Sequence, residues 1–306
     1  MARPRSGRAS RRPRPADLFP APSALGAGFA FTAELHPIRR EWTMQSLEFL
    51  RAWRERARAL EAELPGPERL PAPEEAEAAL GRGEPLITLV EPPIDPDRFT
   101  AVLADLASLY AESRADGRPL AEGLRALPPA EQRTLAEVLV RAGDAAEWAA
   151  RLGVDEGLLL TLGGLALQPF MARFARAVRA VAPLHGWRRI HCPVCGASPD
   201  LCRIDPDNYR YLHCPQCDTQ WEHHRLTCAV CGSDDVRRVS ILTLADLEPW
   251  RVEVCDRCGG YIKTLDQRHG GHLAMPNVDL YLEDARTLQL DLLAEQEGYR
   301  RGGRAQ

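Results

Sequence analysis

Eight of the nine cysteines in this 306-residue chain form four C-x-x-C pairs, all between residues 192 and 258. The pairs are Cys192/Cys195, Cys214/Cys217, Cys228/Cys231 and Cys255/Cys258, and Cys202 stands alone. A C-x-x-C turn points two thiolates at one ion, and two such turns complete a tetrahedral site of four sulfurs. A secreted disulfide scaffold would spread its cysteines along a short chain. The clustering therefore predicts metal ligands in a reducing cytosol.

The spacing between pairs favours two sequential sites. The intervals hold 18, 10 and 23 residues, and the two long ones fit a β-ribbon that leaves one cysteine turn and returns at the next. One predicted site is Cys192, Cys195, Cys214 and Cys217, and the other is Cys228, Cys231, Cys255 and Cys258. An interleaved arrangement, with pair one joined to pair three, is the alternative. Four sulfurs suit iron or zinc, so the spacing does not choose the metal.

Catalysis finds little support in the chain. The sequence carries no nucleophile elbow, phosphate loop or dinucleotide fingerprint. A site filled by four thiolates keeps no open position for water, so metal-assisted hydrolysis is not expected. We predict no catalytic and no cofactor-binding residues, and therefore no enzyme.

Histidines and the ninth cysteine gather in the same region. Cys202 is expected to be a small buried apolar residue. His223 and His224 lie on a predicted strand and must point to opposite faces. We predict that none of the seven histidines between 185 and 272 is a ligand: His185, His191, His213, His223, His224, His269 and His272.

Charge and hydropathy argue against nucleic acid and against membrane insertion. The net charge of the chain is −4, and residues 186–275 hold 11 Lys/Arg against 12 Asp/Glu. Each four-thiolate site with a divalent ion adds a formal charge of about −2 to this region. Such a region does not attract a phosphate backbone. The longest apolar stretch, residues 158–167, is shorter than the roughly 20 residues that span a bilayer, and we expect a buried helix there.

The chain divides into four parts. Residues 1–43 are rich in Arg, Pro and Ala and are expected to be disordered or loosely packed, with no convincing export signal. Residues 44–184 show helical periodicity and predict an all-α domain. Within it, residues 86–90 look extended, and Pro169 should kink or break the helix over 155–182.

Short β-like segments occupy residues 185–275. Strands are expected over 209–214, 219–228, 237–244 and 250–255, which makes this part a double rubredoxin-like or zinc-ribbon module. Residues 276–306 return to helix, over 278–298, and are expected to pack back on the body. The fold class is an α-helical domain plus a small all-β metal-binding module. Trp221, Trp250 and Tyr261 on the strands either anchor a partner surface or pack over the cysteine turns.

The sequence of the cysteine region resembles that of the formate dehydrogenase accessory protein FdhE family. The matching motifs are HCPVCGASP (191–199), RYLHC (210–214) continuing to CDTQW (217–221), RLTCAVCG (225–232) and EVCDRCGGYIK (253–263). A tail such as EQEGY (295–299) also belongs to that pattern. Before residue 187 the likeness is only helical character.

The resemblance implies a cytoplasmic accessory protein with two rubredoxin-like metal ions, iron favoured and zinc the alternative. It implies binding to the catalytic subunit of a respiratory formate dehydrogenase, as a chaperone of enzyme maturation before export. Two other functions stay open. The first is a redox protein that passes electrons to its client, and the second is a structural zinc-ribbon adaptor.

Overall fold

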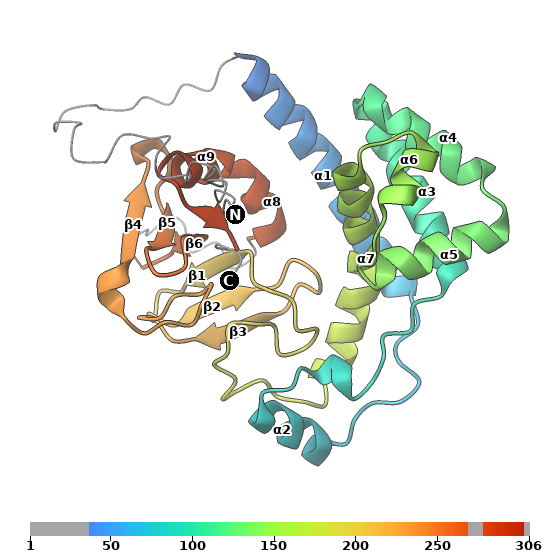
Figure 1. The fold of residues 1–306 in the computed structure, drawn as a ribbon. Helices are drawn as coiled ribbons and strands as arrows, with labels where there is room; N and C mark the ends of the chain where they lie inside the picture. The colour runs from blue at the N-terminus through green and yellow to red at the C-terminus, as the bar shows by residue number, and fades with distance from the viewer. Residues whose placement is uncertain (1–36, 269–277, 303–306) are drawn as a thin grey trace, which may run out of the picture. The chain divides into compact units, whose positions relative to one another are not determined.

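Helices occupy the first part of the chain. The computed structural model describes residues 37–268 and 278–302. Its helices before the sheet are α1 (Pro37–Glu63), α2 (Pro73–Arg82), α3 (Pro96–Ser113), α4 (Arg118–Ala126), α5 (Pro129–Val140), α6 (Ala146–Leu152) and α7 (Glu156–Arg179) (Figure 1). Helices followed by a sheet confirm the predicted fold class. Residues 1–36 of the predicted extension lie outside the described part, whereas residues 37–43 already belong to α1.

Caps fix where two central helices begin. Asp95 precedes α3, accepts a hydrogen bond from the Arg98 amide at 2.7 Å and is followed by Pro96 in the first turn. Asp155 precedes α7 and accepts from the Leu158 amide at 3.1 Å. Both carboxylates satisfy amides that have no partner within the helix, so the helix boundaries follow from local chemistry.

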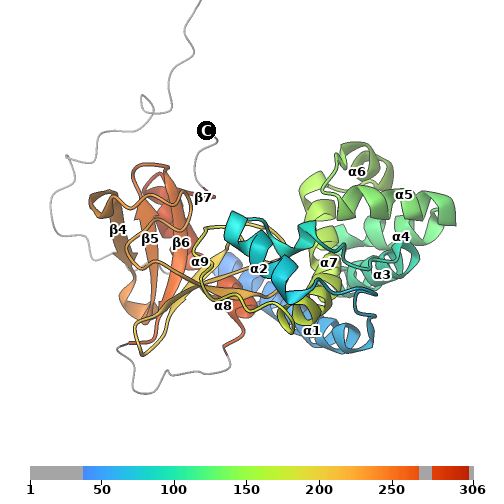
Figure 2. The same cartoon turned by 90° about the horizontal axis from the view of Figure 1, so that it is seen from below.

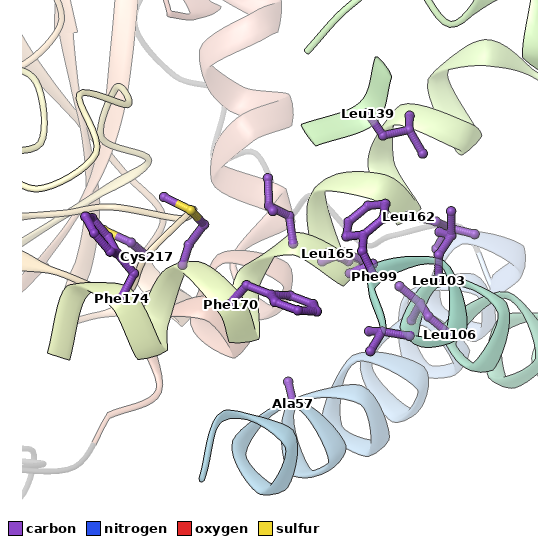
Figure 3. Packing of buried hydrophobic residues seen from close by; sticks show 14 of the residues in the cluster. Ala57, Phe99, Leu103, Leu106, Leu139, Leu162, Leu165, Phe170, Phe174 and Cys217 are labelled. Carbon is purple, nitrogen blue, oxygen red and sulfur yellow. The ribbon is translucent and has the colours of Figure 1, made fainter. Parts of the chain in front are cut away.

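The helical core lies between α3 and α7. Phe99, Leu103 and Leu106 of α3 are fully buried, and Leu162 and Phe170 of α7 belong to the same cluster (Figure 3). By length and composition α7 is apolar enough to cross a membrane, but 61% of its apolar window is buried inside the protein. Burial of that kind is typical of a core helix, as predicted for residues 158–167.

The expected break at Pro169 does not occur. Helix α7 runs without interruption from Glu156 to Arg179 and keeps Pro169 inside it. Proline removes one backbone hydrogen bond and costs about 3 kcal/mol in a helix interior. Residues on both sides of it, from Leu165 to Met171, are buried in the core. Tertiary packing on both flanks therefore outweighs the local penalty.

The expectation of an extended segment at 86–90 was also wrong. Leu86–Thr88 forms a short 3₁₀ turn, η3. The amides of Leu86 and Ile87 donate to the carbonyls of Pro193 and Val194, at 2.9 and 2.8 Å. The β-branched residues suggested a strand, but the hydrogen-bond partner is the first cysteine turn, not a strand. This segment therefore clamps that turn from the helical side.

One sheet carries the cysteine turns. Its strands are β1 (Leu201–Ile204), β2 (Arg210–His213), β3 (Gln220–His223), β4 (Val239–Thr243), β5 (Trp250–Cys255), β6 (Gly260–Asp266) and β7 (Arg300–Arg301). The order is β3-β2-β1-β6-β5-β4, and β7 pairs with β6. Two antiparallel halves join through the parallel β1–β6 pair.

Four strands match the predicted segments, and β1, β6 and β7 were not predicted. Strand β6 is buried along its whole length, so its sequence shows no alternation of apolar and polar residues. The strand aromatics are buried as well: Trp221 is 2% exposed, Trp250 7% and Tyr261 3%. They are therefore not anchors on an exposed surface.

The C-terminal segment forms two helices rather than one. They are α8 (Leu280–Arg286) and α9 (Leu288–Gln296), separated at the buried Thr287. The Thr287 hydroxyl donates to the carbonyl of Glu283 at 2.7 Å, which binds the residue back to the preceding turn. Helix α8 lies beside α1, and α9 lies against β5 and β6 (Figure 2).

Candidate metal centres

The first group of four cysteines, here called site 1, joins two turns. Cys192 and Cys195 precede β1, and Cys214 and Cys217 connect β2 to β3. The Sγ atoms of Cys192 and Cys217 lie 3.6 Å apart, those of Cys195 and Cys214 lie 3.4 Å apart, and all four lie within 4.8 Å of one another. Metal–sulfur bonds of about 2.3 Å in a tetrahedron require sulfurs roughly 3.8 Å apart. The donor set therefore fits one ion.

The second group, site 2, repeats this geometry at the turn between β5 and β6. Cys228 and Cys231 follow β3, and Cys255 and Cys258 connect β5 to β6. The four Sγ atoms again lie within 4.8 Å of one another, with Cys228 and Cys258 at 3.9 Å. The grouping is sequential, not interleaved. Among the described residues neither group includes a histidine, and His269 and His272 lie outside them.

Each cysteine turn closes on a residue in the left-handed conformation. Gly196, Gly232 and Gly259 follow the second cysteine at φ of +80°, +72° and +65°, and their amides donate to the carbonyl of the first. Without a Cβ, glycine adopts this φ at little cost. In the second turn the same position holds Asp218, at φ +57°. The sequence showed the three glycines, but not why an aspartate takes the fourth place.

The thiols in each group shift one another's pKa values. Burial alone would raise the pKa of Cys192, but hydrogen bonds with the other three cysteines lower it. Hydrogen bonds with Cys192 and Cys195 raise the pKa of Cys214 and of Cys217. In site 2 burial raises the pKa of Cys258 to about 11. A divalent cation bound among the sulfurs would let all four deprotonate.

The two sites have different surroundings. Site 1 belongs to the apolar cluster of the helical core, which also contains Phe174, Trp187 and Trp221; Figure 3 shows Cys217 and Phe174 among its side chains. Site 2 forms a small cluster of its own with Val230 and Val239. In each site one cysteine, the second of its first pair, is partly exposed.

His213 supports site 1 without being a ligand. It is 1% exposed and lies between two carboxylates, with Nδ1 2.8 Å from Asp200 and Nε2 2.8 Å from Asp218. Burial would lower the pKa of His213, but the two carboxylates raise it to about 10. Asp218 also accepts from Arg54 of α1 at 3.1 Å, and Arg54 reaches Asp279 before α8 at 3.1 Å. This chain of charges ties the second cysteine turn to the helices.

The remaining candidates are structural. Cys202 is fully buried, as predicted. His223 ends β3 and is 4% exposed, whereas His224 follows the strand and is exposed. Their ring centroids lie 6.1 Å apart, so the pair does not have the opposite orientations predicted for a strand. The sequence missed the link from His213 to Arg54, because nothing in the spacing relates a residue of α1 to the cysteine turns.

Fold and site together define a class of protein: a helical domain joined to a sheet with two tetracysteine centres. Residues 191–225 match the family model described as FdhE, central domain, and residues 226–306 match FdhE, C-terminal domain. These matches confirm the resemblance to the FdhE family seen in the motifs.

Relatives extend this likeness to varying lengths. The FdhE homologue of Aquifex aeolicus is 28% identical over 228 residues, 73% of this chain and 74% of that protein. The homologue of Edwardsiella ictaluri is 33% identical over 65% of this chain and 62% of its own length. Protein FdhE of Escherichia coli O1:K1 is 33% identical over 44% and 43%. The aligned part is thus less than two thirds of the latter two proteins.

A solved structure shares the fold. The crystal structure of the FdhE protein from Pseudomonas aeruginosa superposes with a TM-score of 0.58 at 22% identity, over 88% of both chains. The likeness covers the helices as well as the sheet, where the sequence resemblance is strongest.

Proposed function

We propose that this protein is a cytoplasmic accessory factor for a respiratory formate dehydrogenase. It binds the catalytic subunit of that enzyme and supports its maturation before export. Each of its two tetracysteine centres holds one metal ion, with iron favoured over zinc by the family resemblance. Cys192, Cys195, Cys214 and Cys217 bind one ion, and Cys228, Cys231, Cys255 and Cys258 bind the other.

The observation that carries this proposal is the convergence of eight cysteines into two groups of four sulfurs within a chain of FdhE type. Each set of four donors saturates a tetrahedral ion. An ion bound in this way supplies folding energy or electron transfer, and it leaves no position for substrate. The proposal therefore assigns recognition of the client to the protein surface rather than to a catalytic pocket.

A second candidate is electron transfer to the client. Its support is the partial exposure of Cys195 in site 1 and of Cys231 in site 2, while the other sulfurs are buried. One exposed ligand gives an iron centre a short path to a docked partner. This candidate requires an ion that changes its oxidation state reversibly, which zinc does not do.

The test is capture of the formate dehydrogenase catalytic subunit by the tagged full-length protein, together with formate oxidation in a strain that lacks it. The wild-type gene should restore both the complex and the activity. Full activity in the deletion strain and no captured subunit would remove the proposal.

Visible and redox spectroscopy of the purified protein separates the two candidates. A reversible ferric–ferrous couple that reduces the bound subunit would support the redox function. A colourless protein with two zinc ions that still captures the subunit would leave only the accessory function.

A further inference from the structure

Arg210 lies at the start of β2, and its side chain is 1% exposed. Its Nε donates to Sγ of Cys202 at 3.1 Å, and its Nη1 donates to the carbonyls of His224 and Thr227 at 3.0 and 2.7 Å. Its Nη2 donates to Oε2 of Glu253 at 2.6 Å. One guanidinium thus joins three separate segments of the sheet region.

Two of those segments deliver ligands to site 2. Thr227 directly precedes Cys228, and Glu253 on β5 is two residues before Cys255. Strand β2 itself runs into the second cysteine turn of site 1. Arg210 therefore connects the two segments that carry Cys228 and Cys255 of site 2 to strand β2, which leads into Cys214 of site 1.

The other hydrogen bonds of the loop that leads into site 2 come from its own side chains: the Thr227 hydroxyl donates to the carbonyl of His224 at 3.0 Å, and Arg225 donates to the side chain of Asn208. His224 is exposed, and Leu226 is 68% exposed. The apolar cluster around site 2 adds only small contributions from Val230 and Val239 to the cysteines themselves. A planar guanidinium presents donors from three nitrogens in a rigid fork and so reaches acceptors that lie apart, whereas a lysine presents its three donors from a single nitrogen.

We propose that Arg210 is a positioning residue for site 2. It holds the Cys228 and Cys255 segments at the distance that four-sulfur ligation needs, and so makes metal retention at site 2 depend on β2. The inference rests on the proposed metal sites. The simpler role would be neutralisation of Glu253, whose side chain is 11% exposed.

Two variants separate these roles. Arg210→Lys keeps a positive charge near Glu253 but loses the fork that reaches both carbonyls. Arg210→Met combined with Glu253→Gln removes the charge and its partner together, so no buried carboxylate is left unpaired. If Arg210 only neutralises Glu253, both variants should hold metal as the wild type does.

The measurement is zinc release from the full-length, zinc-loaded protein to a chromophoric chelator. In both variants one of the two equivalents should leave about tenfold or more faster, because loss of residues that orient ligands typically costs 10- to 100-fold in metal affinity. The other equivalent should leave at the wild-type rate. Arg203→Met is the matched control, since Arg203 donates to the side chains of Gln220 and Gln267 on the same sheet.

Hydrogen exchange assigns the affected site. Amides of residues 225–233 and 255–260 should exchange faster in the variants, while those of 192–198 and 214–219 stay protected. Equal release of both equivalents, unchanged release, or loss of protection throughout the chain would each overturn the proposal. If the wild-type protein takes up neither iron nor zinc, the metal sites of the proposed function fail, and exchange at 225–233 alone still decides the role of Arg210.

Discussion

Asp218 takes the place that glycine holds in the other three cysteine turns. Its φ of +57° costs an aspartate more than a glycine, but its carboxylate binds the buried His213 and Arg54 of α1. Aspartate is the more stable choice here only if these contacts contribute more free energy than the left-handed backbone costs it relative to glycine. We infer that Asp218 occupies this position because it connects site 1 to the helices.

Substitution of Asp218 tests that balance. Asp218→Gly relieves the backbone but removes both contacts, so we expect a loss of about 1 kcal/mol in the free energy of unfolding, since Asp218 is partly exposed. Asp218→Asn, which tolerates the same φ, should lose a similar amount. Urea unfolding gives both values. A glycine variant more stable than the wild type would show that the contacts to His213 and Arg54 contribute little.

Asp266 predicts a pH dependence. Burial would raise its pKa, but hydrogen bonds from Arg268 and the charge of Arg251 lower it to about 2. A carboxyl whose folded pKa is depressed stabilises the protein above its unfolded pKa, and this stabilisation is lost as the pH falls through the folded value. The difference in melting temperature between the wild type and Asp266→Asn should therefore be constant above pH 5 or so, and shrink from about pH 4 to pH 2.

Comparison with the variant matters here because acid also protonates cysteine ligands, which affects both proteins alike. A difference in melting temperature between the two proteins that stays the same from about pH 5 to about pH 2.5 would contradict the depressed pKa of Asp266.

At the scale of elements, α9 is fastened to β6 by a buried ion pair. Lys263, the one lysine in the sequence, is fully buried, and its Nζ lies 2.6 Å from Oδ2 of Asp291 on α9. The Tyr261 hydroxyl donates to the other oxygen of Asp291 at 2.8 Å. The docking of the C-terminal helix on the sheet thus depends on a charge that cannot reach water.

Breaking that pair should cost more than replacing it. Asp291→Leu leaves the ammonium with the Asp284 carboxylate, at 2.7 Å, as its remaining charged partner, and is expected to lower the free energy of unfolding by about 2 kcal/mol. Lys263→Met combined with Asp291→Leu should recover most of that loss. Amine labelling followed by mass spectrometry offers an independent measurement, because Lys263 reacts only when α9 separates from β6. Single and double variants of equal stability would contradict this account.

Elements with a clear period could be predicted from the sequence, and those governed by distant contacts could not. The apolar stripes of α3 and α7 and the four cysteine turns are local signals, and the structure has them where expected. The 3₁₀ turn at Leu86–Thr88 depends on a partner more than a hundred residues away. Strand β6 is buried on both faces, and this burial removes the alternation by which strands are recognised.

Site residues divide in the same way. The eight cysteines are visible because spacing encodes the turn. Asp218, His213 and Arg210 act through tertiary hydrogen bonds, for which a single sequence offers no pattern. For Trp221 and Trp250 the sequence left two roles open, since a strand aromatic looks the same whether it faces a partner or a core. The structure shows that both are buried.

For the whole molecule, the two metal centres should contribute unequally to stability. Cys214 lies in the same apolar cluster as the helical core, whereas Cys255 lies in the small separate cluster of site 2. Cys214→Ser should therefore lower the thermal stability of the helices as well as the sheet. Cys255→Ser should loosen residues near site 2 and leave the helical circular dichroism melt close to the wild type.

Hydrogen exchange of α7 amides adds spatial resolution to this comparison. Equal effects of the two serine variants on α7 would mean that site 1 is not integrated into the helical core.

The central claim, two separate four-cysteine metal centres, is tested most directly by the metal content of the purified full-length protein. We predict two equivalents of iron or zinc per wild-type chain. One equivalent should remain in the variant Cys228→Ser with Cys231→Ser, and one in the variant Cys192→Ser with Cys195→Ser. A wild-type protein with less than one equivalent, or a content unchanged in both double variants, would contradict the account.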